Sequence, residues 1–242
     1  MGATMRRLLC TELCPMDYCK ALELQRALVD AKISTTLGRD VLLLLEHPSV
    51  FTLGRRGSHE HLLVAEAFLK SRGIQVIHVE RGGDVTYHGQ GQLVGYPIVD
   101  LRKGRWKVVD FVEALEEVMI RTVADWGIRA GRNPMNRGVW VGMSKIGSLG
   151  IAVRRAVSFH GFALNVNTSL EPFSWINPCG LEGVHVTSMK RLLGKEIPME
   201  DVQGAVCLHI QEIFGVEMEI LSLEDIYLLV GTKTQALERE MV

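Results

Sequence analysis

A glycine-rich segment in the middle of the chain carries several side chains able to bind a ligand. It reads Arg81-Gly-Gly-Asp-Val-Thr-Tyr-His-Gly-Gln-Gly-Gln-Leu93. Paired glycines let the backbone approach a ligand closely, and arginine, threonine, tyrosine and histidine supply polar groups beside them. The segment matches neither the G-x-x-x-x-G-K-S/T phosphate loop nor G-x-G-x-x-G. Standing alone, it also fits a glycine turn with a solvated arginine and histidine.

Two further segments hold a lysine and a cysteine whose side chains are reactive. Lys145 begins the apolar run Lys145-Ile-Gly-Ser-Leu-Gly-Ile151, where a surface lysine is the simplest interpretation of the lysine alone. Cys179 stands between Pro178 and Gly180. A tight turn of this kind presents a thiol instead of packing it, which is the placement a nucleophile needs.

Taken together, these segments resemble a known family. RGGDVTYHGQGQLVGYP, KIGSLG, SFHGFALNVN and INPCGL, in this order and at these separations, are similar to the motifs of the lipoyl(octanoyl) transferases. The resemblance runs from about Leu24 to about Phe214. It implies a single-domain α/β (α+β) fold of the biotin/lipoate protein ligase catalytic-domain type, with a mixed β-sheet flanked by helices. It also implies an acyltransferase of protein lipoylation and lipoate biosynthesis, which moves an octanoyl or lipoyl group from acyl carrier protein to a lysine of lipoyl domains.

The resemblance assigns roles to individual positions. Cys179 is similar to the cysteine that holds the acyl thioester, and Lys145 to the lysine that lowers the pKa of that thiol. The positions similar to the family's acyl-substrate walls are Arg81, Gly82, Gly83, Asp84, Val85, Thr86, Tyr87 and His88, then Ser148, Leu149 and Gly150, then Gly161, Phe162 and Ala163. Asp84 and Gln90 depart from the residues usual in relatives, which affects the expected loop rigidity but not the reaction.

The partners and cofactors follow from the same resemblance. The donor is octanoyl-acyl carrier protein, which carries the acyl group on phosphopantetheine. The acceptors are lipoyl domains of 2-oxoacid dehydrogenase complexes and the glycine cleavage H protein. No cofactor is implied, neither ATP nor a metal, and neither nucleic acid nor a membrane is an expected partner. The histidines themselves predict no metal site, because only His59 and His61 lie close together and no third ligand is near.

The proposed pair of side chains suits the chemistry. An unperturbed cysteine has a pKa near 8.5, so only a few per cent is thiolate at neutral pH. A neighbouring ammonium that lowers this pKa by about two units corresponds to roughly 2.7 kcal/mol. The thiolate attacks the carrier thioester, and the acceptor amine then attacks the new thioester, with neutral Lys145 as the base. Burying about six methylenes contributes about 5 kcal/mol, and Leu149, Phe162 and Leu164 are candidate lining residues.

Two other functions remain open on the sequence. An ATP-dependent lipoate or biotin protein ligase shares the fold and uses a lysine at this place to bind a phosphate, and Leu53-Gly-Arg-Arg-Gly-Ser58 resembles the nucleotide loop of biotin ligases. Such a ligase needs no thiol at Cys179. A non-catalytic acyl-protein binding module on the same fold would keep its activity after Cys179→Ser. The presence of both Cys179 and Lys145 favours the transferase.

Charge is unevenly distributed along the chain. Between Trp126 and Leu170 there is no acidic residue, and the basic residues of that stretch are Arg129, Arg132, Arg137, Lys145, Arg154 and Arg155. Residues 102–107 form a second basic cluster. This asymmetry predicts a positive face that attracts acidic carrier proteins. The alternative is a basic surface balanced by acids folded alongside it.

Both helices and strands are expected to position these segments. Hydrophobic spacing predicts helices after the cap Asp17 (through Leu28) and over Leu62–Ser71, Val108–Trp126, Val186–Leu193 and Met199–Phe214. The predicted strands are Val41–Leu45, Ile74–Val79, Gln92–Leu101, Gly138–Val141, Lys145–Arg154 and Ser158–Val166. Pro97 suggests that its strand is an edge strand or carries a bulge. One domain over 1–242 with a mixed sheet is expected, and the tail from about 222 is uncertain.

Composition places the chain among ordinary globular proteins. Its 242 residues are 47% hydrophobic and 23% charged, with a net charge of -1. The longest aliphatic run, Val41–Leu45, is far shorter than the roughly 18 residues of a membrane span. The N-terminus lacks an apolar signal region, so we expect a cytoplasmic protein. We expect the five cysteines to be free, with Cys10, Cys14 and Cys19 buried as small apolar residues near the first helix and Cys207 in the core.

Overall fold

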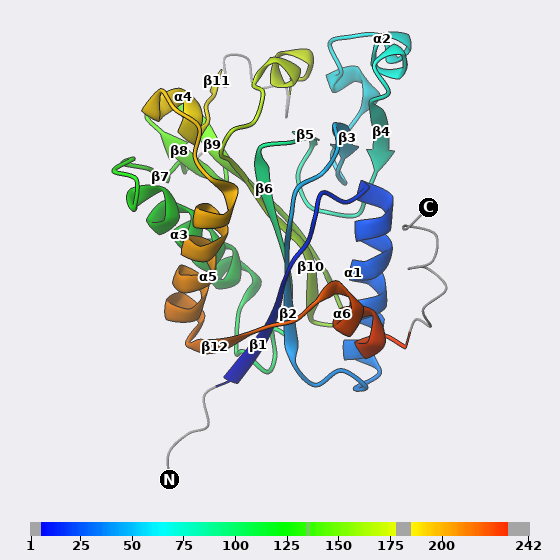
Figure 1. The fold of residues 1–242 in the computed structure, drawn as a ribbon. Coiled ribbons are helices and arrows are strands. Elements are labelled where there is room, and N and C mark those ends of the chain that lie inside the picture. The colour runs from blue at the N-terminus through cyan, green and yellow to red at the C-terminus, as the bar shows by residue number, and fades with distance from the viewer. Residues whose placement is uncertain (1–5, 135, 178–184, 232–242) are drawn as a thin grey trace.

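The large β-sheet is the frame of the molecule. The computed structural model describes residues 6–134, 136–177 and 185–231. Within these residues a nine-stranded sheet has the order β12-β1-β2-β6-β10-β9-β8-β7, with β11 paired to β9 (Figure 1). Its strands are β1 (Arg6–Glu12), β2 (Asp40–Leu45), β6 (Gln92–Ile98), β7 (Gly131–Arg132), β8 (Val139–Val141), β9 (Ser144–Arg154), β10 (Val157–Asn165), β11 (His185–Val186) and β12 (Val216–Ile220). Because β1 is parallel to β2 and β12 while β2, β6, β10 and β9 alternate in direction, the predicted mixed sheet is confirmed.

Helices cover both faces of this sheet (Figure 1). One face carries α1 (Tyr18–Ile33) and α6 (Leu223–Leu229), and the other carries α3 (Val108–Ala124) and α5 (Met199–Phe214). The shorter helices are α2 (Glu66–Ser71), α4 (Met189–Leu193) and the 3-10 turns His59–His61 and Glu171–Trp175. Helix α1 begins where the sequence predicts, because the Asp17 carboxylate accepts the backbone N–H groups of Cys19 and Lys20.

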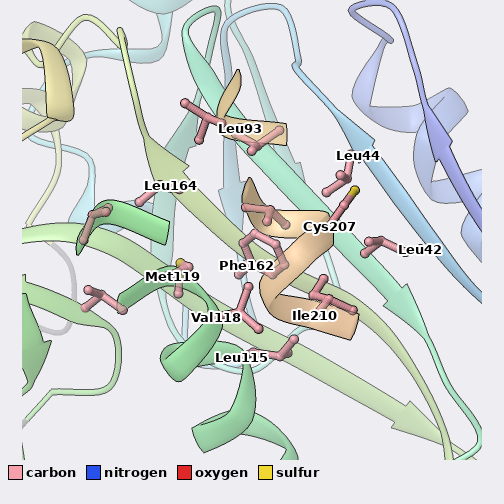
Figure 2. Packing of buried hydrophobic residues seen from close by; sticks show 14 of the residues in the cluster. Leu42, Leu44, Leu93, Leu115, Val118, Met119, Phe162, Leu164, Cys207 and Ile210 are labelled. Carbon is pink, nitrogen blue, oxygen red and sulfur yellow. The ribbon is translucent and has the colours of Figure 1, made fainter. Parts of the chain in front are cut away.

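The leucine run of β2 divides the core into two layers. Leu42 and Leu44 pack toward α3 and α5, and Leu43 and Leu45 pack toward α1, because successive strand side chains point to opposite faces. Figure 2 shows the first layer, in which Phe162 of β10 lies among residues of α3 and α5. All residues of β2 from Val41 to Leu45 are fully buried, as the sequence predicts.

A smaller three-stranded sheet lies beside one end of the large sheet (Figure 1). Its order is β4-β3-β5, with β4 (Gln75–His78), β3 (Val50–Leu53) and β5 (Val85–His88). It has its own hydrophobic cluster, which includes Phe51, Tyr87 and Trp175. Consequently the glycine-rich segment connects two sheets: it contains β5 of the small sheet and runs directly into β6 of the large one.

Several expected boundaries are wrong, each for a local reason. The helix predicted from Leu62 begins only at Glu66, because Leu62 makes an antiparallel bridge to Ile176. The helix predicted from Val186 begins at Met189, because His185 and Val186 pair with β9. Both corrections have one origin, since pairing with distant residues replaced local helical structure.

Pro97 lies in an inner strand, so the edge-strand alternative is wrong. Strand β6 lies between β2 and β10, and the ladder to β10 is interrupted opposite Pro97. There His160 has a φ of 52° and donates its backbone N–H to Gln25 Oε1 (2.8 Å). A local interruption of the ladder therefore accommodates the missing N–H of proline. The register is the same on both sides of it, from Phe162 opposite Gly95 to Val157 opposite Asp100, so β6 carries no bulge there.

The cysteine expectation holds only in part. Cys10 and Cys207 are buried, with their sulfurs 3.9 Å apart between β1 and α5. Cys14 and Cys19 are exposed, which contradicts their expected burial. Proximity to a helix does not decide burial, because Cys19 is the second residue of α1 and is exposed to solvent. Among the described residues, no helix combines the length and apolarity required to cross a bilayer.

Candidate active site

A cavity of ≈ 700 Å³ lies where the two sheets meet, and the predicted segments form its walls. Of the sixteen positions predicted as catalytic or substrate-binding, fourteen line it: Lys145, Arg81, Gly82, Gly83, Asp84, Val85, Thr86, His88, Ser148, Leu149, Gly150, Gly161, Phe162 and Ala163. Three segments distant in the sequence therefore enclose one space. Cys179 lies outside the described residues, so its role and its distance from Lys145 stay predictions.

Tyr87 is the predicted position that does not line the cavity. Strand β5 alternates, so Thr86 and His88 share one side and Tyr87 points to the other. The Tyr87 ring packs between Phe51 and Phe173, and its hydroxyl is 2.9 Å from Ser49 Oγ. It supports the small sheet and does not contact the space beside it. Leu164, a candidate for lining, is likewise fully buried in the core.

The loop that begins at Arg81 is held against the edge of β9. Gly82 donates its N–H to the carbonyl of Ile151 (2.9 Å), and a Cβ at Gly150 would lie 2.8 Å from the Gly82 carbonyl. The Arg81 guanidinium is buried and donates to the carbonyl (2.7 Å) and hydroxyl (2.8 Å) of Thr52 on β3. These glycines therefore permit close contact between loop and strand, and Arg81 fixes the loop on the small sheet.

Lys145 projects from the start of β9. Its Nζ donates to Asn136 Oδ1 (2.9 Å) and lies 5.4 Å from the centre of the Trp140 ring. Gly138 has a φ of 131°, and a Cβ there would lie 2.4 Å from Lys145 Cε. The lysine stem therefore occupies the space that a side chain at position 138 would need. Asn136 and Arg137 also line the cavity, and only the tertiary structure shows this.

Buried histidines and tyrosines form another wall. Tyr18, His88, Tyr96 and His160 all line the cavity, and all are buried. The Tyr18 and His88 rings stack with centres 5.7 Å apart. Burial lowers the pKa of His160 to about 4 and that of His88 well below its usual value, and it raises the pKa of Tyr18 to about 12. These groups are neutral at physiological pH and act there as hydrogen-bonding groups without charge. His160, expected near the site as a supporting residue, lies in this wall.

His47 supports this wall from behind and makes stability depend on pH. Its Nδ1 is 2.7 Å from the Met16 carbonyl and its Nε2 is 2.7 Å from the Tyr96 hydroxyl, so Nδ1–H donates and Nε2 accepts. Burial lowers the pKa of His47 from 6.5 to about 4. Between pH 6.5 and about pH 4, His47 binds a proton in the unfolded chain but not in the folded protein. The free energy of unfolding therefore decreases as the pH falls through this range.

We expect His47→Gln to flatten this pH dependence. Glutamine can donate to Met16 and accept from Tyr96, but it does not titrate. The wild type should lose up to about 3 kcal/mol more than the variant between pH 7 and pH 4, from a shift of this size at one buried imidazole. Urea unfolding at several pH values measures the difference. Parallel curves for the two proteins would contradict the assignment of this proton to His47.

Both chain ends that flank residues 178–184 are anchored beside the cavity. Before them, Asn177 donates its N–H to the carbonyl of His61 (2.9 Å), and His61 Nδ1 is 2.7 Å from Asp84 Oδ1. After them, Val186 pairs with Lys145. Asp84, one of the two departures from the family pattern, thus fastens the segment that precedes Cys179. The sequence did not reveal this role of His61, because Asp84 and Asn177 are distant from it along the chain.

Three of the six basic residues between Trp126 and Leu170 make ion pairs with acids. Arg132 and Arg137 make ion pairs with glutamates of α3, and Arg154 pairs with Asp30 of α1. Arg154 is also the last residue of β9, nine residues beyond Lys145, or roughly 30 Å along the strand. For these residues the structure favours the alternative of a compensated surface over a positive face around the site. Among the described residues, no group of three or more His, Cys, Asp or Glu side chains could hold a metal ion.

Comparisons with known proteins agree on one family. The family model described as "Lipoyl protein ligase A/B catalytic domain" matches residues 17–211. A protein from Desulfotalea psychrophila named octanoyltransferase is 49% identical over 212 residues, covering 87% of this chain and 95% of that protein. A second octanoyltransferase, from Caldicellulosiruptor bescii, is 46% identical over 224 residues, with coverages of 90% and 98%.

Solved structures show the same fold at much lower identity. A lipoate-protein ligase A bound with ATP superposes with a TM-score of 0.71 at 16% identity, covering 94% of this chain and 93% of that one. P. falciparum LipL1 in complex with lipoate superposes with a TM-score of 0.72 at 12% identity, covering 91% and 67%. The predicted fold class is therefore confirmed.

Proposed function

The chain belongs to the family of lipoyl protein ligase A/B catalytic domains and is an octanoyltransferase of protein lipoylation, and we propose that it performs the transfer in two steps, through a thioester on Cys179. The observation that carries this proposal is the position of Lys145. It lines a cavity that is also lined by Ile176 and Val186, the lining residues nearest to Cys179 on either side along the chain.

In the first step the Cys179 thiolate attacks the carbonyl carbon of the carrier-bound thioester. A new C–S bond forms, the old one breaks, and the carrier leaves as a thiolate that takes a proton from the Lys145 ammonium, which leaves Lys145 neutral. The Lys145 ammonium favours the Cys179 anion by charge, and the acceptor side chain of Asn136 holds that ammonium in place. One thioester replaces another, so this step is nearly isoenergetic.

In the second step the amine of the acceptor lysine attacks the Cys179 thioester. The C–N bond forms, the C–S bond breaks, and the amine proton passes to neutral Lys145. The product is an amide, and the greater stability of the amide drives the cycle without ATP. Lys145 is therefore charged in the first step and neutral in the second.

The acyl chain occupies the cavity between the sheets. Val94 and Ala163 offer apolar surface there, beside the predicted positions Leu149 and Phe162. Burying about six methylenes contributes about 5 kcal/mol. We propose octanoyl-acyl carrier protein as the donor. The acceptors are lipoyl domains of 2-oxoacid dehydrogenase complexes and the glycine cleavage H protein, and the reaction takes place in the cytoplasm without a cofactor.

Intact mass spectrometry tests the proposal. The protein is incubated with octanoyl-acyl carrier protein in the absence of ATP, and we expect one octanoyl adduct that hydroxylamine removes and that Cys179→Ala lacks. Cys14→Ala, which removes an exposed thiol, is the matched control and should keep the adduct. An adduct that persists in Cys179→Ala would place the thioester elsewhere. Modification of a lipoyl domain only when ATP and a free acid are supplied would instead identify a ligase.

A further inference from the structure

Two buried amide side chains, on the paired strands β6 and β10, connect His88 of β5 to the chain beside Lys145 of β9. Gln92 opens β6 and Asn165 ends β10, and the two residues are register partners. Gln92 Nε2 donates to Asn165 Oδ1 (2.9 Å), and the residues are only 2% and 4% exposed. Neither lines the cavity, although each contacts residues or segments that do.

Gln92 determines how His88 faces the cavity. Its Nε2 also donates to the carbonyl of Tyr87 (3.2 Å), so its Oε1 is the atom that accepts from His88 Nδ1 (2.7 Å). His88 is neutral because burial keeps its pKa well below the usual value. The proton of the ring is therefore on Nδ1, and Nε2 carries the lone pair in this wall of the cavity.

Asn165 determines where the chain passes after residues 178–184. Its Oδ1 is used by Gln92, so its Nδ2 donates to the carbonyl of Thr187 (3.0 Å). The N–H of Thr187 in turn donates to the carbonyl of Lys145 (2.9 Å). Thr187 directly follows β11, which pairs with Ser144 and Lys145. A continuous series of buried hydrogen bonds thus connects the His88 ring to the backbone of Lys145.

We propose that Gln92 and Asn165 are positioning residues for acyl transfer. Together they fix the backbone of Lys145 relative to β11, the strand by which the chain returns from Cys179, and they fix the orientation of His88. The inference rests on the proposed function of Lys145 and Cys179. Because small displacements of reacting groups have large effects, a misplacement of about 1 Å lowers the rate roughly 100-fold.

The chain offers a matched control two residues away. Asn167 also uses both of its amide atoms in hydrogen bonds, in its case with backbone alone: Nδ2 donates to the carbonyl of Ile197 (2.7 Å) and Oδ1 accepts the Ile197 N–H (3.1 Å). It connects the end of β10 to the residues before α5 and does not line the cavity. Asn165→Leu and Asn167→Leu therefore remove similar bonds, of which only the first set reaches the site.

Steady-state kinetics with both substrates test the inference. We expect Asn165→Leu to lower kcat roughly 100-fold with KM for the carrier changed less than about twofold, and Asn167→Leu to keep kcat within about threefold. Asn165→Asp is a milder second variant. It keeps the acceptor for Gln92 but sets a carboxylate oxygen against the Thr187 carbonyl, and we expect an intermediate loss of kcat.

The pH dependence of thiol alkylation separates positioning from a general loss of structure. In a Cys14→Ser, Cys19→Ser background, Asn165→Leu should shift the iodoacetamide profile of Cys179 toward the ordinary value of about 8.5, and Asn167→Leu should not. If Asn165→Leu and Asn167→Leu have equal kcat values and equal alkylation profiles, the inference is overturned. If Asn165→Leu does not fold, Asn165→Asp is compared with the wild type instead, and equal kcat values and profiles for those two proteins overturn it. Absence of a Cys179 adduct in the wild-type protein would instead refute the proposed function.

Discussion

Replacing Lys145 by methionine is expected to lower octanoyl transfer by roughly 10²- to 10⁴-fold, the range that a positioned acid–base group contributes. Methionine keeps an unbranched apolar stem beside Trp140, so the fold should be retained. The loss should appear in both half-reactions, because the variant lacks the charge that favours the thiolate and the base that accepts the amine proton. Single-turnover kinetics of Cys179 acylation and deacylation measure the two losses separately.

Lys145→Arg distinguishes the two roles of the lysine. Arginine keeps the positive charge but does not lose its proton, so acylation should be retained better than aminolysis. Lys190→Met is the control, since Lys190 is an exposed lysine that pairs with Glu196 (2.6 Å) and lies outside the lining of the cavity. Turnover of Lys145→Met within about threefold of wild type would contradict any chemical role for this side chain, given the range expected of a positioned acid–base group.

Gly161→Ala is expected to destabilise the protein severely. A Cβ at this position would lie 2.0 Å from the Gly95 carbonyl oxygen and 2.7 Å from Pro97 Cδ, so β10 and β6 would have to separate. Overpacking usually costs about 1 to 3 kcal/mol, and a collision with backbone in the central strands should cost on the order of 3 or more. Chemical denaturation measures the change in free energy of unfolding.

The matched substitution is Gly204→Ala in α5. Among the described residues, a Cβ at Gly204 would have no atom within 4 Å apart from its chain neighbours and the backbone of its own helix. Alanine there should stabilise the protein by about 1 kcal/mol because it favours helix. If Gly161→Ala unfolded at the same denaturant concentration as the wild type, this result would contradict the close approach of β10 to β6 at Gly161.

The sequence predicted the elements whose signals are local. Asp17 caps α1, the apolar spacing of α3 and α5 marks them as amphipathic, and the leucines of β2 mark a buried strand. The resemblance also identified three separated segments that enclose the cavity. These successes share a cause, because each depends on neighbours along the chain or on matched motifs.

The remaining features depend on contacts between distant residues. Strand β1 has little alternation of its own, and β12 alternates over only five residues, so the sequence does not show that these two distant segments pair with each other. His61 and Asn165 matter because of the residues they contact after folding, and Tyr87 turns away from the cavity because of the register of β5 on β3. Likewise, the acids that balance Arg132 and Arg154 are far away in the sequence.

The position of β1 has a consequence for biosynthesis. Strand β1 precedes the other described elements along the chain, and its partners are β2 and, on the other edge, β12 at Val216–Ile220. At about 5 to 20 residues per second, a nascent chain waits roughly 10 to 40 s between translation of β1 and translation of β12. During that interval one edge of β1 is unpaired and open to other chains. Protection by a chaperone should therefore matter most before β12 leaves the ribosome.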